Sequence, residues 1–179
     1  HGAMREPAHD LVTGLYTLSF FNVRLTFSLE RIKQSMFRQF GVLFVDVIQI
    51  EDMRRELFGR ELDDFQRKLA DAFKSTLRPT DTMAWSAADG LLLTLVEDIP
   101  STDVPLKIAT RVWDGLRKYL DVTVNIPATR LSLGVLICDT DYDDVHSIHA
   151  DIALARNLLR SGQYSSPAIF NREMLYSRK

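Results

Sequence analysis

An arginine and an aspartate three positions apart, Arg78 and Asp81, point most directly to ligand chemistry in this chain. An arginine can meet two acceptors at once, such as the N7 and O6 atoms of guanine. A carboxylate accepts the N–H donors on the opposite edge of that base, and the arginine can also stack on a second ring. The pair therefore suits a ligand that carries guanine bases, although the same two residues could form a surface salt bridge that contributes little.

The elements that must position these residues follow from hydrophobic spacing. Helical periodicity marks residues 17–38, 65–77, 106–116 and 143–160. Short β-rich runs mark strands at 42–48, 82–86, 91–96, 122–126 and 130–138. The first run is too apolar for a sheet edge, and the second and third flank a glycine-containing turn that predicts a hairpin. The order predicts an α/β or α+β domain with helices covering a central sheet.

Composition excludes several classes of protein. The chain has 179 residues with 22 Lys and Arg against 24 Asp and Glu, so it lacks the positive surplus needed to bind a nucleic-acid backbone. Its one cysteine, Cys138, excludes an internal disulfide and is expected to be a buried thiol. We find no membrane-spanning stretch and no signal peptide, and therefore expect a cytoplasmic domain without membrane contact, whose parent protein could be membrane-associated. Residues 1–4 resemble a cloning remnant, and 5–179 are interpreted as one domain cut from a longer protein.

Five short motifs occur in a recognisable order. They are Asp10-x-x-Thr13-Gly14-Leu15, Phe44-Val45-Asp46, Leu77-Arg78-x-x-Asp81, Leu131-Ser132-Leu133-Gly134-Val135 and Ala150-Asp151-x-Ala153-Leu154. Together their order and spacing resemble the GGDEF domain, the fold of bacterial diguanylate cyclases, over about residues 10–172. The resemblance implies a central, mostly antiparallel five-stranded sheet surrounded by helices.

The family's catalytic signature departs from its pattern here. The resemblance implies condensation of two GTP molecules into cyclic di-GMP, with the signature G-G-[DE]-E-F at Ala87-Ala88-Asp89-Gly90-Leu91. Both glycines are alanine, whose Cβ obstructs a close approach of phosphate to the backbone. Gly90 replaces the glutamate. We therefore expect a degenerate domain that is not an enzyme.

Other positions implied by the resemblance have changed as well. The base-reading asparagine is Arg54, which can only donate hydrogen bonds, although Asp63 keeps the second base-reading position. The late phosphate-binding lysine is Leu158, and the aromatic residue before it is Ala155. Asp46 and Asp89 survive where the family brings oxygen ligands to Mg²⁺. They are either a residual Mg²⁺ site or a vestigial pair, and no cofactor is expected to be required.

The family's product-binding site is retained, according to the same resemblance. It is an R-x-x-D motif placed five residues before the signature, which is the position of Arg78 and Asp81. A further arginine is expected on the helix after the hairpin, and Arg111 occupies that place. The implied ligand of these three residues is cyclic di-GMP.

Three functions remain open at this point. The first is a receptor that binds cyclic di-GMP and signals to a neighbouring domain or a partner protein. The second is a pseudo-enzyme that binds no cyclic di-GMP but forms a homodimer or holds GTP to regulate an attached enzyme. The third, an active cyclase with an unusual signature, is least supported.

Two further groups of polar residues are not interpreted as sites. His146 and His149 are expected on a solvated helix face rather than at a metal. The acidic run 139–144 lacks the spacing of a calcium loop and is expected to cap the helix that follows.

Overall fold

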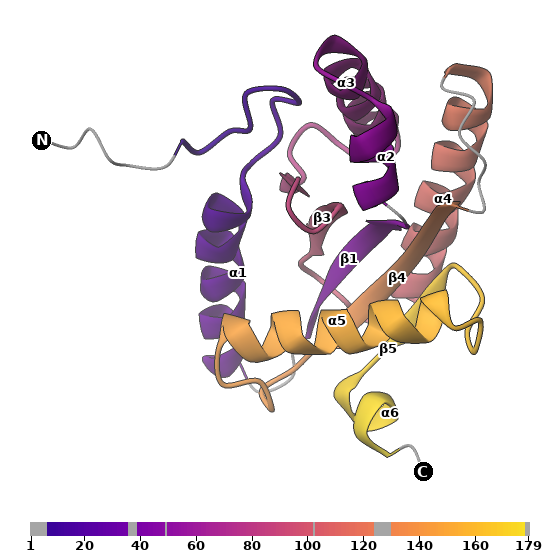
Figure 1. Cartoon of the computed structure of the whole chain (residues 1–179). Coiled ribbons are helices and arrows are strands. Elements are labelled where there is room, and N and C mark those ends of the chain that lie inside the picture. Colours follow the sequence, from indigo (N-terminus) through magenta and orange to yellow (C-terminus); the bar gives the residue numbers. More distant parts are fainter. Residues whose placement is uncertain (1–6, 36–38, 49, 102, 124–129, 178–179) are drawn as a thin grey trace, which may run out of the picture.

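The computed structural model describes residues 7–35, 39–48, 50–101, 103–123 and 130–177. Its core is one sheet with the strand order β2-β3-β1-β4-β5. The strands are β1 (Phe40–Val47), β2 (Met83–Ser86), β3 (Leu91–Val96), β4 (Leu131–Cys138) and β5 (Ala168–Phe170). All neighbouring pairs are antiparallel except β4 and β5, which are parallel. The expected five-stranded, mostly antiparallel sheet is therefore confirmed (Figure 1).

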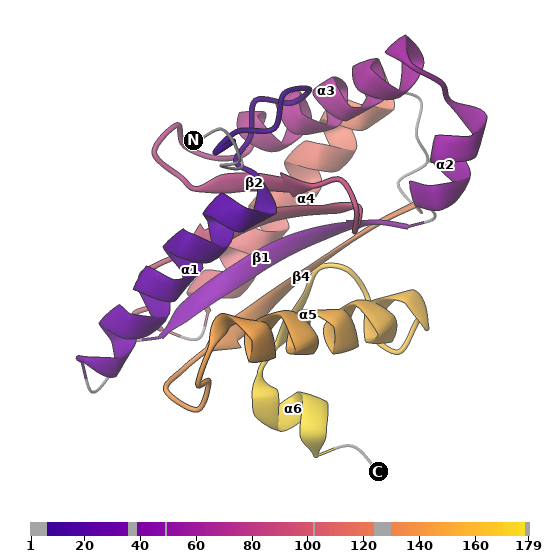
Figure 2. The same ribbon diagram turned by 60° about the vertical axis from the view of Figure 1, so that its left-hand side comes forward.

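Helices cover both faces of this sheet. They are α1 (Leu18–Lys33), α2 (Ile50–Glu56), α3 (Arg60–Ser75), α4 (Val104–Thr123), α5 (Val145–Arg160) and α6 (Arg172–Tyr176). Figure 2 shows α3 and α4 on one side of the sheet and α1 and α5 on the other. All eight residues of β1 are buried, as expected for a central strand between two helical layers.

Alternation along β1 sends successive side chains to different layers. Leu43, Val45 and Val47 pack in the cluster with α3 and α4. Val42 and Phe44 pack in the cluster with α1 and α5. Asp46 follows the second set in this alternation, so its carboxylate is on the face covered by α5.

The long helices follow the predicted periodicity. Phe65, Leu69 and Phe73 are buried along α3, and α4 and α5 extend over the predicted stretches. The first helix ends at Lys33 rather than at residue 38, and residues 36–38 are outside the described part of the chain. The predicted remnant, residues 1–4, is also outside it.

The predicted strand at 122–126 is wrong where it can be tested. Residues 122 and 123 belong to α4, and 124–126 are outside the described residues. The β-branched residues favoured a strand by propensity, but the apolar stripe of Val112, Leu116 and Leu120 binds the helix to the core. The fifth strand is instead β5, a three-residue run that was not predicted.

The acidic run before α5 caps that helix, which confirms the prediction. Asp144 is the N-cap residue, and its Oδ1 accepts the backbone N–H of Ser147 at 2.9 Å. Within α5, Asp151 is fully buried. Its two carboxylate oxygens accept the hydroxyls of Tyr142 at 2.5 Å and Tyr176 at 2.6 Å. This network joins α5 to α6 and to the loop that precedes α5.

Cys138 is a free thiol, fully buried at the end of β4, as predicted. Burial raises the pKa of this thiol well above its ordinary value. Among the described residues, no helix has the length and apolar character needed to span a membrane.

Candidate functional site

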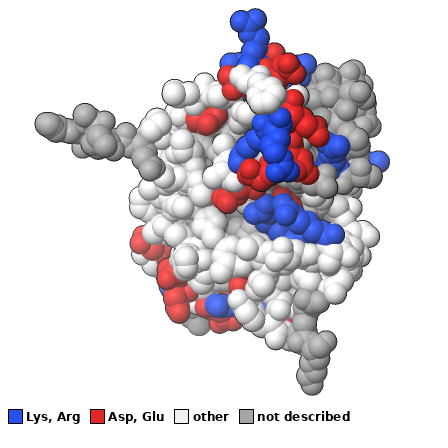
Figure 3. All heavy atoms as spheres, in the orientation of Figure 1, with Lys and Arg blue, Asp and Glu red and all other residues white. Residues whose placement is uncertain are grey.

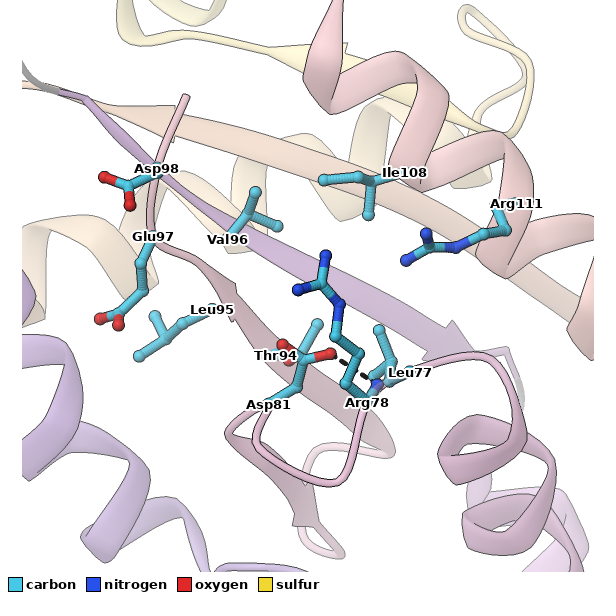
Figure 4. Close-up of a pocket in the computed structure, with 10 residues that line it drawn as sticks. All are labelled: Leu77, Arg78, Asp81, Thr94, Leu95, Val96, Glu97, Asp98, Ile108 and Arg111. Carbon is cyan, nitrogen blue, oxygen red and sulfur yellow. Dashed lines mark hydrogen bonds between the residues drawn. The ribbon is translucent and has the colours of Figure 1, made fainter. Parts of the chain in front are cut away.

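A pocket of about 240 Å³ lies where the C-terminal end of β3, the connection from α3 to β2, and α4 meet. The lining residues include all three predicted ligand contacts, Arg78, Asp81 and Arg111 (Figure 4). Leu77, Val96 and Ile108 form its apolar part. Residues from three separate segments, 77–81, 94–98 and 108–111, thus share one pocket.

The connection between α3 and β2 is folded into a tight turn that fixes the R-x-x-D motif. The backbone N–H of Asp81 donates to the carbonyl of Arg78 at 3.0 Å, with Pro79 at the second position, which favours such turns. The Asp81 Oδ2 atom in turn accepts the backbone N–H of Arg78 at 2.8 Å. One carboxylate oxygen therefore holds the turn, and Oδ1 is left for other interactions.

The side chains of Arg78 and Arg111 both extend into the pocket, and the guanidinium of Arg111 points toward that of Arg78 (Figure 4). Both residues are exposed, and neither guanidinium has a hydrogen bond or ion pair within the described part of the chain. Two guanidinium groups that extend into the same space favour an anion near them, in a pocket whose lining also includes Asp81, Glu97 and Asp98.

The acidic residue Glu97 at the far side of the pocket is engaged elsewhere. Its Oε1 atom accepts the hydroxyl of Ser28 at 2.6 Å and pairs with Arg31 of α1 at 3.4 Å. Figure 4 shows its carboxylate directed away from the two arginines. Glu97 therefore does not neutralise the arginine side of the pocket.

A second polar cluster surrounds Asp46 at the end of β1. Both carboxylate oxygens accept hydrogen bonds from Arg160, at 2.6 Å from Nε and 2.8 Å from Nη2. The Nη2 atom of Arg156 donates to Oδ1 at 2.9 Å. The hydrogen bond to Asp46 raises the pKa of Arg160 above its ordinary value. Asp46 is thus fully buried and held by two guanidinium groups.

The turn of residues 87–90 between β2 and β3 lies next to this cluster. The backbone carbonyl of Asp89 accepts a hydrogen bond from the Nη2 atom of Arg156 at 2.9 Å. The carboxylate of Asp89 accepts one from the Ser86 hydroxyl at 2.8 Å. Gly90 has a φ of +68°, and a Cβ there would meet the Ile50 side chain at 2.9 Å. Asp46 and Asp89 are therefore linked through Arg156, as neighbours of the same arginine.

The other positions named from the family pattern lie on α2, α3 and α5. Arg54 pairs with Glu51 at 2.5 Å on the surface of α2. Ala155 and Leu158 are buried on the face of α5 that packs against the sheet. Asp63 lies in the first turn of α3.

The two histidines of α5 are not together at a metal site. His149 Nε2 forms a 2.6 Å hydrogen bond with Asn22 Oδ1 of α1, whereas His146 is exposed. Within the described ranges, no group of three His, Cys, Asp or Glu residues could hold a metal ion.

Sequence reasoning missed Arg156 and Arg160. Their spacing of four shows only that they share a face of a helix. Their partner, Asp46, is 110 and 114 positions away, so no local pattern could identify the contact.

A family model described as "Diguanylate cyclase, GGDEF domain" matches residues 7–162, which include both the pocket and the Asp46 cluster. The chain belongs to the GGDEF family. The assignment from motif order is therefore confirmed. A comparison with curated proteins gave no significant match to this GGDEF sequence.

Solved GGDEF domains share the fold. The GGDEF domain of TpbB (YfiN) from Pseudomonas aeruginosa has a TM-score of 0.70 at 19% identity, covering 93% of this chain and 95% of that one. The GGDEF domain of DgcB from Caulobacter crescentus, in complex with c-di-GMP, has a TM-score of 0.72 at 12% identity, with coverages of 93% and 98%. Vibrio cholerae LapD, comprising S helix, GGDEF and EAL parts and bound to c-di-GMP, has 0.68 at 19%, with coverages of 92% and 36%.

Proposed function

We propose that this GGDEF domain is a catalytically inactive receptor for cyclic di-GMP. The observation that carries the proposal is the pocket into which Arg78 and Arg111 both extend beside Asp81. Cyclic di-GMP offers two phosphates and two guanines. The guanidinium groups would neutralise phosphate charge or grip a guanine edge, and the free Oδ1 atom of Asp81 would accept guanine N–H donors.

Loss of catalysis is part of the proposal and is supported by several positions. A close approach of phosphate to the turn is hindered by the side chains of Ala87 and Ala88. Leu158 offers no charge to a phosphate, and it is buried in the core. Arg54 is paired with Glu51 and cannot replace the two-sided hydrogen bonding of an asparagine.

The proposed receptor acts on another protein or domain, since ligand binding alone changes nothing downstream. The link from Glu97 to Ser28 and Arg31 places α1 in contact with the rim of the pocket. A partner that contacts α1 would therefore lie next to the rim of the pocket. We place this activity in the cytoplasm, in agreement with the single buried thiol.

Isothermal titration calorimetry with cyclic di-GMP tests the proposal. We expect saturable binding in the micromolar range or tighter, which falls at least tenfold in Arg78→Ala and in Arg111→Ala. The variant Asp81→Asn keeps an oxygen for the turn but replaces the free acceptor with an amide, so it should lose affinity without losing thermal stability.

Arg67→Ala provides the matched control, because Arg67 is an exposed arginine of α3 outside the pocket, paired with Asp64. It should bind as the wild type does. Binding that is unaffected by all three pocket variants, or no binding by the wild type, would show that the domain is not a receptor of this kind.

Experiments with GTP distinguish the two alternative functions, an active cyclase and a pseudo-enzyme that holds GTP. Incubation with GTP and Mg²⁺ should yield no cyclic di-GMP, including when a dimeric coiled coil is fused before α1 to bring two copies together. Product formation would establish an active cyclase instead. GTP binding that depends on Asp46, without binding of cyclic di-GMP, would favour the pseudo-enzyme.

A further inference from the structure

The position at which the family brings oxygen ligands to Mg²⁺ is filled by two arginine side chains. Arg160 reaches Asp46 with the two donors of its guanidinium edge, and Arg156 adds a third N–H. Arg156 is mostly buried, with 17% of its side chain exposed, and Arg160 has 38% exposed. In Figure 3, basic side chains gather over the C-terminal part of α5, beside the mixed charges over α2.

A divalent cation does not fit this arrangement. Mg²⁺ holds its oxygen ligands at about 2.0–2.1 Å in octahedral geometry. Oδ1 of Asp46 already accepts two arginine N–H groups and Oδ2 accepts one, at 2.6–2.9 Å, so a bound cation would have to share the carboxylate with two guanidinium groups or displace one of them. The two positive charges next to the same carboxylate would also repel it.

The buried polar atoms without hydrogen-bond partners at this end of the sheet also bear on whether a cation fits. Within the described residues, the Nε atom of Arg156 and the hydroxyl of Ser132 are buried and have no hydrogen-bond partner. Ser132 is directly opposite Asp46 in the pairing of β1 with β4. An arginine Nε can only donate, so this atom of Arg156 lacks an acceptor and cannot be a ligand of a cation, whereas the Ser132 hydroxyl could donate or accept.

We propose that Arg156 and Arg160 replace the family's divalent cation, so that Asp46 is a structural anchor and this domain takes no Mg²⁺ there. The arginines join α5 to the end of β1 and, through the carbonyl of Asp89, to the turn between β2 and β3. This inference goes beyond the proposed receptor function and does not depend on cyclic di-GMP binding.

Mn²⁺ is a spectroscopic probe of the same site. Titration followed by electron paramagnetic resonance should leave the signal of free Mn²⁺ undiminished by the wild-type protein. The melting temperature should be the same in millimolar Mg²⁺ as in sodium chloride of equal ionic strength. Saturable Mn²⁺ binding that is lost in Asp46→Asn would overturn the proposal.

A double-mutant cycle tests the arginine contact itself. Asp46→Asn should lower the melting temperature by roughly 5–15 °C, since it leaves two arginine side chains without their carboxylate. Arg160→Gln should lower it by less, since Asp46 keeps its contact with Arg156. The double variant should lose clearly less than the sum of the two, because the second change removes the group left unpaired. Additive losses would show that the contact is not formed.

The surface pair Asp64 and Arg67 provides the matched control. It has the same residue types at 3.0 Å, but both side chains are about half exposed. Asp64→Asn and Arg67→Gln should show almost no coupling in the same cycle. Single variants at Arg160 also remain interpretable, because this side chain is less buried than that of Arg156.

Discussion

Gly90 determines whether the turn between β2 and β3 could again carry the acidic residue of the family signature. Its φ of +68° lies in the left-handed region that glycine adopts without steric cost. A Cβ atom at this position would lie 2.9 Å from the Ile50 side chain, so any side chain here would be both strained and crowded. The packing of α2 on this turn therefore disfavours a glutamate at position 90.

Gly90→Glu should destabilise the domain and should not restore cyclase activity. We expect a loss of about 1–3 kcal/mol in the free energy of unfolding, from the left-handed backbone and the contact with Ile50. Urea unfolding and an assay for cyclic di-GMP formation measure the two effects. Ala88→Glu places the same side chain at an exposed position of the turn and should cost less than about 0.5 kcal/mol. Equal stability of the two variants would contradict this account of Gly90.

His149 should make stability depend on pH. Burial lowers the pKa of His149 below its ordinary value of 6.5, and the charge of His146 lowers it further, whereas the Asp89 carboxylate opposes both. As pH falls through the unfolded value near 6.5, the unfolded chain takes up a proton that the folded ring does not. Stability should therefore be complete above about pH 7.5 and decrease as the pH is lowered from about 7 toward 5.

Melting temperatures of wild type and His149→Gln between pH 5 and 8 measure this effect. A glutamine can keep a hydrogen bond to Asn22 but cannot titrate, so its profile should be flatter on the acid side. The two profiles should run in parallel above about pH 7.5. A variant that loses stability on acidification as steeply as the wild type would show that His149 does not contribute.

At the scale of elements, the network around Asp151 attaches the C-terminal segment to the rest of the molecule. The strand β5 has only three residues, so its ladder with β4 is short. Hydrogen bonds to Asp151 raise the pKa of Tyr176, and burial together with the same carboxylate raises the pKa of Tyr142. Both tyrosines therefore remain protonated donors throughout the physiological range.

Asp151→Ala should cost about 3 kcal/mol in the free energy of unfolding, because two tyrosine hydroxyls lose a charged acceptor. Tyr176→Phe should cost about 1 kcal/mol, since Tyr176 is exposed and its hydroxyl can bond to water when unfolded. Urea unfolding measures both. Tyr164→Phe removes a hydroxyl with no described partner and should be nearly neutral. A loss for Tyr164→Phe equal to that for Tyr176→Phe would show that the network adds nothing.

Periodicity predicted the elements that bury a continuous apolar stripe. The stripe of Phe65, Leu69 and Phe73 determines α3, and the apolar run from Val42 determines most of β1. Short elements were missed, because α2 buries only Ile50 and Met53 and β5 is too short to show alternation. Residues 122 and 123 were predicted as part of a strand but belong to α4, because the packing of a long helix outweighs local β propensity.

Residues of the two polar clusters also differ in how far the sequence could predict their contacts. The proximity of Arg78 and Asp81 could be predicted because their contact is local, closed by a turn of four residues, while their role as ligand contacts stays a prediction. Arg111 was found through its place in the family pattern, and the pocket brings it beside the other two. Arg156 and Arg160 could not be found, because their role depends on the sheet that brings the end of β1 beneath α5.

At the scale of the whole molecule, a ligand that binds only the folded state must stabilise it. Cyclic di-GMP at about one hundred times its Kd should add about 2.7 kcal/mol, which corresponds to a rise of roughly 5–11 °C in melting temperature for a domain of this size. Differential scanning fluorimetry over a concentration series measures the rise.

Arg78→Ala and Arg111→Ala should remove that rise while leaving the melting temperature of the free protein unchanged, because both side chains are exposed and unpaired within the described residues. A rise that persists in both variants would place the ligand elsewhere on the domain. A large fall without ligand would show that these arginines are structural.

The inaccessible sulfur of Cys138 makes the domain convenient for single-site labelling. A maleimide dye should not react with a thiol that is fully buried and whose pKa is raised. A new cysteine at Lys107, an exposed position on α4 one turn before Arg111, would then be the only reactive one in the folded protein. Its fluorescence would report occupancy of the neighbouring pocket without prior removal of the native cysteine.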